Sequence, residues 1–103
     1  MYIVVFVTCA KKEEARKIAK ALLKSKLAAC VNITGAVESF FWWKARIDRS
    51  SEYLLVAKST RAKLKGIIKK VGSLHSYEVP EIIALPVCAG SKAYLDWIDE
   101  SIG

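Results

Sequence analysis

The sequence opens with an apolar run, Tyr2 to Thr8, that is rich in β-branched and aromatic side chains. A run of this kind is typical of a central strand that is buried on both faces. Directly after it, at about 12–26, apolar residues recur at the spacing of one helix face, with lysines between them. The chain therefore begins with a central strand and an amphipathic helix that has one buried stripe.

A pair of long strands is expected in the middle of the chain. An extended pattern runs from 28 to 43 with a bend or bulge at Gly35, and a return strand is expected over 46–59. Only Lys44 and Ala45 separate the two runs, which predicts a hairpin. Neither residue favours the positive φ of a primed turn, so the hairpin is predicted from spacing and not from turn chemistry.

The last part of the chain adds a helix, a strand and a further helix. The second helix is expected over 61–71, where apolar residues share one face and Gly72 is placed to end it. A strand over 79–87 follows, and Pro86 inside it indicates an edge strand or a strand end, because proline cannot donate to a ladder. Ser91 is placed to cap the C-terminal helix.

The order of these elements is that of the split βαβ arrangement, so we predict an α+β, ferredoxin-like fold with an extra C-terminal helix. Right-handed crossovers place both main helices on one face of an antiparallel sheet and leave the other face uncovered. The aromatic run Phe40–Trp43 lies on strands that are too long for one small domain to bury. Pairing with neighbouring subunits would cover both surfaces, which predicts an assembly of several subunits.

Length and composition predict one domain spanning residues 1–103. A hydrophobic content of 53% is enough for a core of its own in a chain of this size. No apolar run is long enough to span a bilayer, and the first residues lack the basic flank and cleavage site of a signal peptide. We therefore expect a cytoplasmic protein with no membrane partner.

The chain is basic, with 17 lysines and arginines against 10 acidic residues and a net charge of +7. Such an excess raises nucleic acid as a partner. Most of the basic residues, however, fall at helical spacing opposite the apolar stripes, with no stacking aromatics between them. This pattern is typical of solvated helix faces, so nucleic acid is not the expected partner.

The only histidine, His75, lies where the second helix passes into the last strand. Imidazole and thiolate are suitable ligands for copper, and Cys9 lies at the end of the first strand. One histidine does not make a metal site, so further ligands would have to come from Cys9, Cys30, a carboxylate such as Glu81, or symmetry-related chains. The alternative is that His75 closes the helix end by hydrogen bonding to nearby backbone.

Several spaced motifs in one order resemble the CutA divalent-cation tolerance proteins, a family of small trimers whose subunit is similar to that of the PII signalling proteins. The resemblance covers essentially the whole chain. It is carried by Leu27 to Ile33, Trp42-Trp43 with Ile47, Glu52 with Leu54-Leu55 and Lys58, His75 with Tyr77, Val79, Pro80 and Glu81, and Tyr94, Leu95, Trp97 and Ile98.

The chain departs from the family pattern at several positions. Ala45 stands where members commonly have glycine, and Phe41 replaces a tyrosine, Ser59 a threonine and Ser76 a proline. The cysteine linked to copper in some members aligns with Val7, and Cys9 follows two residues later, where an extended strand directs it to the same side.

The resemblance implies a homotrimer that binds copper or other divalent cations and contributes to metal-ion tolerance, with His75 and Cys9 as metal ligands. It implies no organic cofactor. The sequence itself contains no Gly-rich phosphate loop, G-x-S-x-G elbow or paired-carboxylate motif, so we do not expect an enzyme.

The alternative is a PII-like regulator whose inter-subunit clefts bind a small anionic ligand or a partner protein. Its expected cleft residues are Trp43, Glu52, Lys58, Tyr77 and Glu81, although these charged residues could equally form ion pairs that fix the trimer. A nucleic-acid binder driven by the net charge is a third hypothesis.

Overall fold

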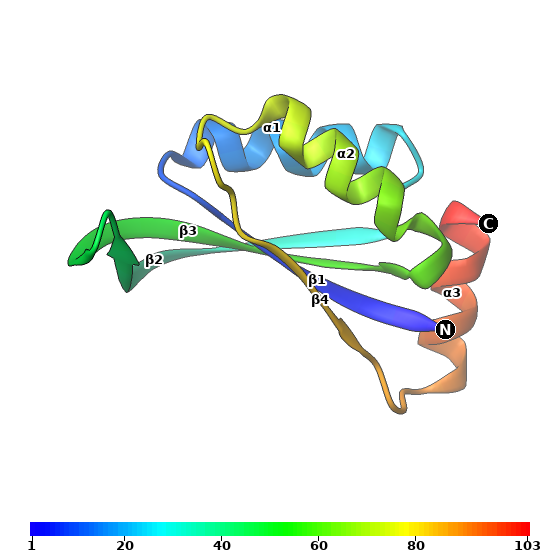
Figure 1. The fold of residues 1–103 in the computed structure, drawn as a ribbon. Coiled ribbons are helices and arrows are strands. Elements are labelled where there is room, and N and C mark those ends of the chain that lie inside the picture. The colour runs from blue at the N-terminus through cyan, green and yellow to red at the C-terminus, as the bar shows by residue number, and fades with distance from the viewer.

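A computed structural model describes residues 1–103 and shows a four-stranded antiparallel sheet with strand order β2-β3-β1-β4. The elements are β1 (Tyr2–Cys9), α1 (Lys12–Lys24), β2 (Cys30–Trp43), β3 (Arg46–Thr60), the 3-10 turn η1 (Arg61–Lys63), α2 (Leu64–Leu74), β4 (Ile82–Pro86) and α3 (Lys92–Ile102). Helices α1 and α2 lie side by side on one face of the sheet, and α3 lies at its end near the N-terminus (Figure 1). The predicted ferredoxin-like fold is confirmed. None of these helices has the length and apolar character needed to cross a membrane.

The core lies between the sheet and the two helices. On β1, alternate residues from Ile3 to Cys9 point toward the helices and are at most 4% exposed, because successive strand side chains face opposite ways. Ile18 and Leu22 of α1 and Ile67 of α2 meet them from above and are fully buried. The apolar stripes read from the sequence are therefore the faces that form the core.

The opposite face of the sheet is uncovered, as predicted. It carries the other alternate residues of the strands, among them Val4 and Phe6 of β1 and Val56 of β3. Ile83 and Leu85 of the edge strand β4 pair with this row and are 52% and 44% exposed. An apolar sheet face left in water is a surface that another protein chain can cover.

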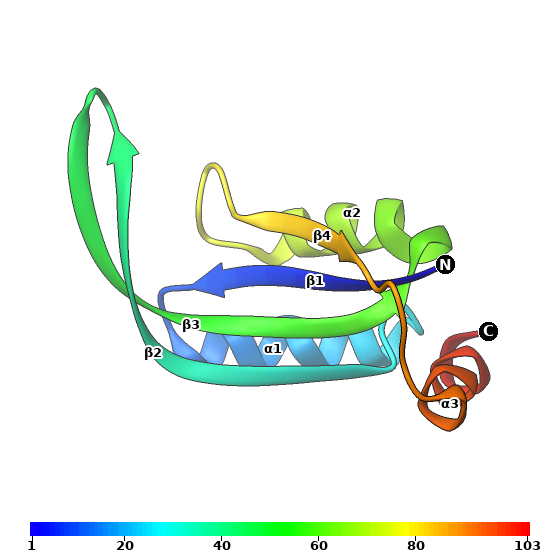
Figure 2. The same ribbon diagram turned by 90° about the horizontal axis from the view of Figure 1, so that it is seen from below.

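The β2–β3 hairpin extends beyond the sheet and curls away from it (Figure 2). Its turn is Lys44-Ala45, with φ values of 51° and 64°, so the hairpin is confirmed and both residues adopt the left-handed region. The expected bulge is also present, between Thr34 and Val37. Gly35 lies there because a Cβ at this position would approach the Tyr53 ring to 2.2 Å.

Helix α2 does not end where the sequence indicated. It continues through Gly72, which is not in a positive-φ conformation, and ends at Leu74. The residue that ends it is His75, whose backbone is extended with φ −79° and ψ 141°. The predicted end at 71 is thus wrong, since a contact of the His75 side chain, described below, replaces the glycine stop.

The last strand is shorter than predicted, and the C-terminal helix begins as predicted. Strand β4 pairs with β1 only from Ile82 to Pro86, so the residues before it belong to a loop. Pro86 therefore closes an edge strand, in agreement with its missing donor. Ser91 caps α3 by accepting a hydrogen bond from the Tyr94 backbone N–H at 3.3 Å.

The charge is divided between the two layers. Residues 11–26 and 61–74, which include α1 and α2, carry twelve basic and two acidic side chains. The rest of the chain carries five basic and eight acidic side chains. The helical layer therefore holds all of the net positive charge, and the sheet with its hairpin, loops and α3 is slightly acidic.

Candidate functional site

A cluster of Cys9, Glu14 and His75 lies where three elements meet. Cys9 ends β1, Glu14 lies in the first turn of α1, and His75 follows α2. The sulfur of Cys9 is 3.7 Å from His75 Nε2, and His75 Nδ1 is 3.7 Å from Glu14 Oε2. One potential ligand atom from each residue lies within 4.8 Å of the others. The fold thus brings together the two residues predicted as metal ligands and adds a carboxylate.

The His75 ring is held by backbone groups on both sides. Its side chain is 0% exposed. Nε2 donates to the Thr8 carbonyl oxygen at 2.7 Å, and Nδ1 accepts from the Tyr77 backbone N–H at 3.1 Å. Both nitrogens of a neutral ring are satisfied by these bonds. His75 therefore ties β1 to the α2–β4 loop, which is the helix-closing role considered above as the alternative to metal binding.

The other two members of the cluster are also engaged. Burial raises the pKa of the Cys9 thiol to about 12, and the negative charges of Glu14 and Glu52 add to the shift, so the thiol is protonated at neutral pH. The Glu14 carboxylate accepts from the Ser76 N–H at 3.0 Å and the Ser76 hydroxyl at 3.2 Å. Without a cation the cluster is a closed hydrogen-bonded unit.

The donor set nevertheless fits a small divalent cation. Thiolate, imidazole and carboxylate are the ligands of zinc and copper sites. Ligand atoms bound tetrahedrally at about 2.0–2.3 Å lie roughly 3.3–3.8 Å apart, which matches the 3.7 Å between Cys9 Sγ and His75 Nε2. The 3.7 Å contact of Glu14 is to the other ring nitrogen, Nδ1, so it is the distance to a partner of the ring and not between two ligands of one ion. Binding requires the Cys9 proton to leave and one backbone hydrogen bond of His75 to break.

Glu14 is the member of the cluster that was not expected from the sequence. Its position in the first turn of α1 is explained equally well by the helix dipole, so it gave no separate signal. Its spacing of five residues from Cys9, across a turn from strand to helix, is the only local indication. Cys30, considered as a further ligand, pairs with Lys58 on β3, and Lys58 in turn lies opposite Val4, far along β1 from Cys9.

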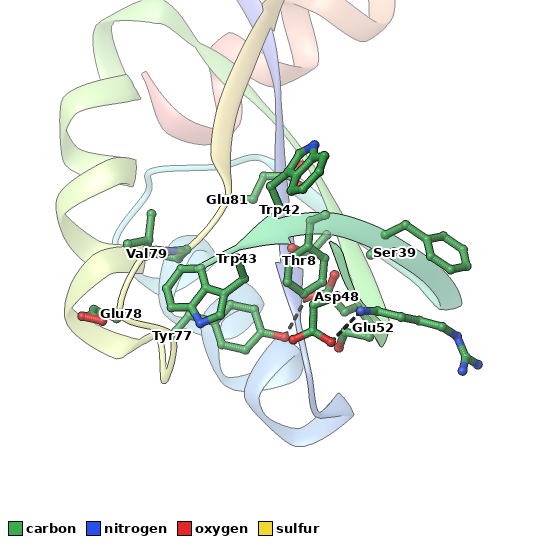
Figure 3. Close-up of a pocket in the computed structure, with 15 residues that line it drawn as sticks. Thr8, Ser39, Trp42, Trp43, Asp48, Glu52, Tyr77, Glu78, Val79 and Glu81 are labelled. Atoms are coloured by element: carbon green, nitrogen blue, oxygen red, sulfur yellow. Dashed lines mark hydrogen bonds between the residues drawn. The ribbon is translucent and has the colours of Figure 1, made fainter. Parts of the chain in front are cut away.

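A pocket of about 850 Å³ lies between the β2–β3 hairpin and the α2–β4 loop (Figure 3). Its walls are of two kinds. Aromatic rings come mainly from the hairpin, and carboxylates come from both segments. The lining includes Phe40, Phe41, Trp42, Trp43 and Tyr77, and the acids Asp48, Glu52, Glu78 and Glu81.

Glu52 is the most buried of the pocket's charged residues, at 5% exposed. Its Oε2 accepts a hydrogen bond from the Tyr77 hydroxyl at 2.7 Å. Burial, this bond and the carboxylate charge raise the pKa of Tyr77 to about 12. Burial also raises the pKa of Glu81, and the charge of Glu52 adds to that effect. The pocket is therefore a region of concentrated negative charge.

Four of the five residues predicted for a shared cleft, Trp43, Glu52, Tyr77 and Glu81, line this one pocket. The structure places Lys58 elsewhere. It lies on the uncovered face of β3, where its amino group donates to the Asn32 side-chain oxygen of β2. The one basic residue of the expected cleft thus contributes nothing to the pocket.

The split βαβ topology, the long aromatic hairpin and the Cys-Glu-His cluster define a small ferredoxin-like protein with soft and hard cation ligands at one end of its sheet. The family model described as CutA1 divalent ion tolerance protein matches residues 3–101. The chain belongs to this family, so the resemblance found in the sequence is confirmed.

Curated relatives and solved structures agree with this assignment. The divalent-cation tolerance protein CutA of Archaeoglobus fulgidus is 42% identical over 102 residues, covering 99% of each chain. That of Thermus thermophilus is 43% identical over 100 residues, covering 97% of each. Solved structures from these two organisms superpose with a TM-score of 0.97 over 100% of each chain. The fold is therefore shared with these proteins over its full length.

The expected cytoplasmic location is contradicted by the relatives. The Archaeoglobus fulgidus structure is described as that of a periplasmic protein. A relative from Arabidopsis thaliana is described as chloroplastic, and the 99 matched residues, at 41% identity, make up 54% of its length. The prediction depended on the absence of a membrane-spanning apolar run and of signal-peptide features in the first residues, and neither absence identifies the compartment.

Proposed function

We propose that this CutA-family protein is a homotrimer that binds copper or another thiophilic divalent cation through Cys9, Glu14 and His75, and that it is not an enzyme. The observation that carries the proposal is the convergence of a thiol, a carboxylate and an imidazole from three elements within 4.8 Å. The family name gives the class of ion, a divalent cation. The donor set favours ions at the copper and zinc end of the first-row series.

The chain's own groups set the conditions for binding. Cys9 must lose its proton, and its raised pKa makes that loss costly at neutral pH. His75 must free one nitrogen from either the Thr8 carbonyl or the Tyr77 N–H. Glu14 can bind the cation directly or hold the ring proton of His75, which is the usual partner of a metal-bound imidazole.

Proton release makes the affinity depend on pH. One proton leaves Cys9 for each cation bound, so affinity should rise about tenfold per pH unit throughout the neutral range, where the thiol is protonated. A carboxylate site without a thiol would show almost no pH dependence above pH 6, because its ligands are already ionised.

The test is a calorimetric titration of Zn(II), followed by Cu(II), into the reduced full-length chain. Zn(II) comes first because it is not reduced by thiols. Cys9→Ser should lose most of the binding, whereas Cys88→Ser, which changes an exposed cysteine, should bind as the parent does. Titration in buffers of different ionisation enthalpy counts the protons released. Equal binding in Cys9→Ser and the parent, or binding without proton release, would refute the proposed site.

The proposed trimer is supported by the amount of apolar surface left uncovered. The sheet face exposes Ile83 and Leu85, and the hairpin exposes Phe40, Trp42 and Ile47 by 64%, 72% and 65%. Surfaces of this kind are buried in stable oligomers. Sedimentation analysis at several protein concentrations should give three times the mass of the chain, and a monomer at micromolar concentration would contradict the assembly.

The alternative of a small anionic ligand receives less support. The lining of the pocket contains four acidic residues, and its only basic residue is Arg49, which is paired with Glu38 at 2.8 Å. Lys58, the cation expected to bind an anion there, lies on another surface. An anion entering the pocket would meet unfavourable charge.

A further inference from the structure

We propose that the pocket between the β2–β3 hairpin and the α2–β4 loop binds an organic cation that carries an ammonium or guanidinium group. This site is separate from the Cys9 cluster, and the proposal does not depend on metal binding there. Three properties of the pocket point to such a ligand: the sign of its charge, the exposure of its aromatic rings, and a largely buried carboxylate that keeps one oxygen open to the pocket.

The charge of the pocket selects cations. Asp48, Glu52, Glu78 and Glu81 line it, and no lysine does. The Arg49 guanidinium is directed to Glu38, with Nε 2.8 Å from Oε2, and so leaves the pocket's acids unpaired. A concave surface with one sign of charge raises the local concentration of ions of the opposite sign.

Glu52 supplies the anchoring group. It is 5% exposed, and its only hydrogen bond is to the Tyr77 hydroxyl through Oε2. Its second oxygen accepts no hydrogen bond from the chain and is not a buried unsatisfied atom, so it is accessible from the pocket that Glu52 lines. An oxygen of a largely buried carboxylate that stays open to the pocket can accept a charge-assisted hydrogen bond from an ammonium or guanidinium group.

The aromatic rings determine the kind of cation. Phe41 and Trp43 remain 38% and 40% exposed on the wall of the pocket, and the Tyr77 ring lies next to Glu52, as Figure 3 shows. Ring faces attract ammonium and guanidinium groups but offer no ligand atom to a metal ion. A wall that combines rings with carboxylates is therefore suited to an organic cation.

Geometry also argues against a bare metal ion in this pocket. Cys9, Glu14 and His75 are the only group of three or more ligating residues close enough to hold a metal, so the pocket's carboxylates do not converge on one point. Their spread over a volume of about 850 Å³ suits an extended molecule with one or two cationic ends.

The experiment is a titration of the full-length chain with butane-1,4-diamine and with agmatine, in EDTA to remove metal ions and with citrate as the anionic control. Trp42 and Trp43 lie in the pocket, so their fluorescence reports binding, and calorimetry gives the affinity. We expect saturable binding of the two cations and none of citrate. Absence of saturation up to millimolar ligand, or equal binding of citrate, would overturn the proposal.

Variants locate the site. Glu52→Gln, Phe41→Leu and the exposed Glu81→Gln should each weaken binding about fivefold to tenfold. Glu100→Gln, on α3 and outside the pocket, is the matched control and should bind as the parent does. Equal effects of Glu81→Gln and Glu100→Gln would refute the site, and Glu81→Gln keeps the test valid if Glu52→Gln does not fold.

The same chemistry could come from a lysine or arginine of a neighbouring copy. In that case the free amines would not bind the assembled parent, and Glu52→Gln would lower the oligomer mass. This outcome would assign the pocket to the assembly and overturn the small-ligand proposal. If the amines bind in EDTA and also bind to Cys9→Ser, their site is independent of the metal site, and the failure of either proposal leaves the other one standing.

Discussion

His75→Ala should lower the free energy of unfolding by about 3–5 kcal/mol. The substitution removes a fully buried ring and leaves two partly buried backbone groups, the Thr8 carbonyl and the Tyr77 N–H, without their partners at 2.7 and 3.1 Å. Each unsatisfied group costs about 1–3 kcal/mol, and the cavity adds to the loss. Because small domains are stable by only about 5–15 kcal/mol, the variant should fold but unfold at much lower denaturant.

Urea unfolding followed by tryptophan fluorescence measures this loss. Protein concentration must be equal for all variants, because assembly contributes to stability. Ser76→Ala removes only the exposed hydrogen bond from the Ser76 hydroxyl to Glu14, keeps the one from the backbone N–H, and should cost less than about 1 kcal/mol. If His75→Ala also loses less than 1 kcal/mol while metal binding disappears, the ring is chiefly a metal ligand and the structural role assigned to it is wrong.

Substitutions in the hairpin turn, at the buried Cys9 thiol and in the aromatic part of the hairpin should change stability, its pH dependence and the oligomer mass. Ala45→Gly should stabilise the protein by about 1 kcal/mol in urea unfolding, because the φ of 64° at this position is strained for alanine and not for glycine. The control Ala93→Gly, in the helix α3, should destabilise it. A loss of stability in both variants would contradict strain in the turn. Cys9 has a pKa of about 12 in the fold against 9.0 ordinarily, so stability should fall as pH rises from 9 to 12. An equal fall in Cys9→Ala would exclude this cause. Trp43→Ala should shift the assembly toward monomer or aggregate, and unchanged mass by light scattering at low concentration would refute that.

The order of the elements could be predicted from the sequence because each depends on local periodicity. The hairpin is an example, since the spacing around Lys44 and Ala45 permits little else. The end of α2 could not be predicted in this way. It is determined by His75, whose ring reaches the Thr8 carbonyl on a strand 67 residues earlier, and no local pattern reports such a contact.

The sites could be predicted only in part, because the sequence identifies candidate residues but does not show how far apart they lie in the fold. Cys9 and His75 could be singled out by residue type, but their proximity comes from the tertiary fold. Lys58 and Glu52 were both expected in a shared cleft, and both lie on β3. Six residues of strand separate them by roughly 20 Å, so one lies by the pocket and the other well along the sheet.

The division of charge between the layers has a kinetic consequence. A cation that approaches the protein from the side of α1 and α2 meets a layer with twelve basic and two acidic side chains and is repelled. The pocket, which is lined by four acidic residues and one arginine, is the attractive approach, so diffusion to it is restricted to a limited range of directions. Added salt screens the long-range repulsion of the net charge of +7 before it screens contacts inside the sites. Cations should therefore associate faster as ionic strength rises, the reverse of the trend for a net acidic cation-binding protein.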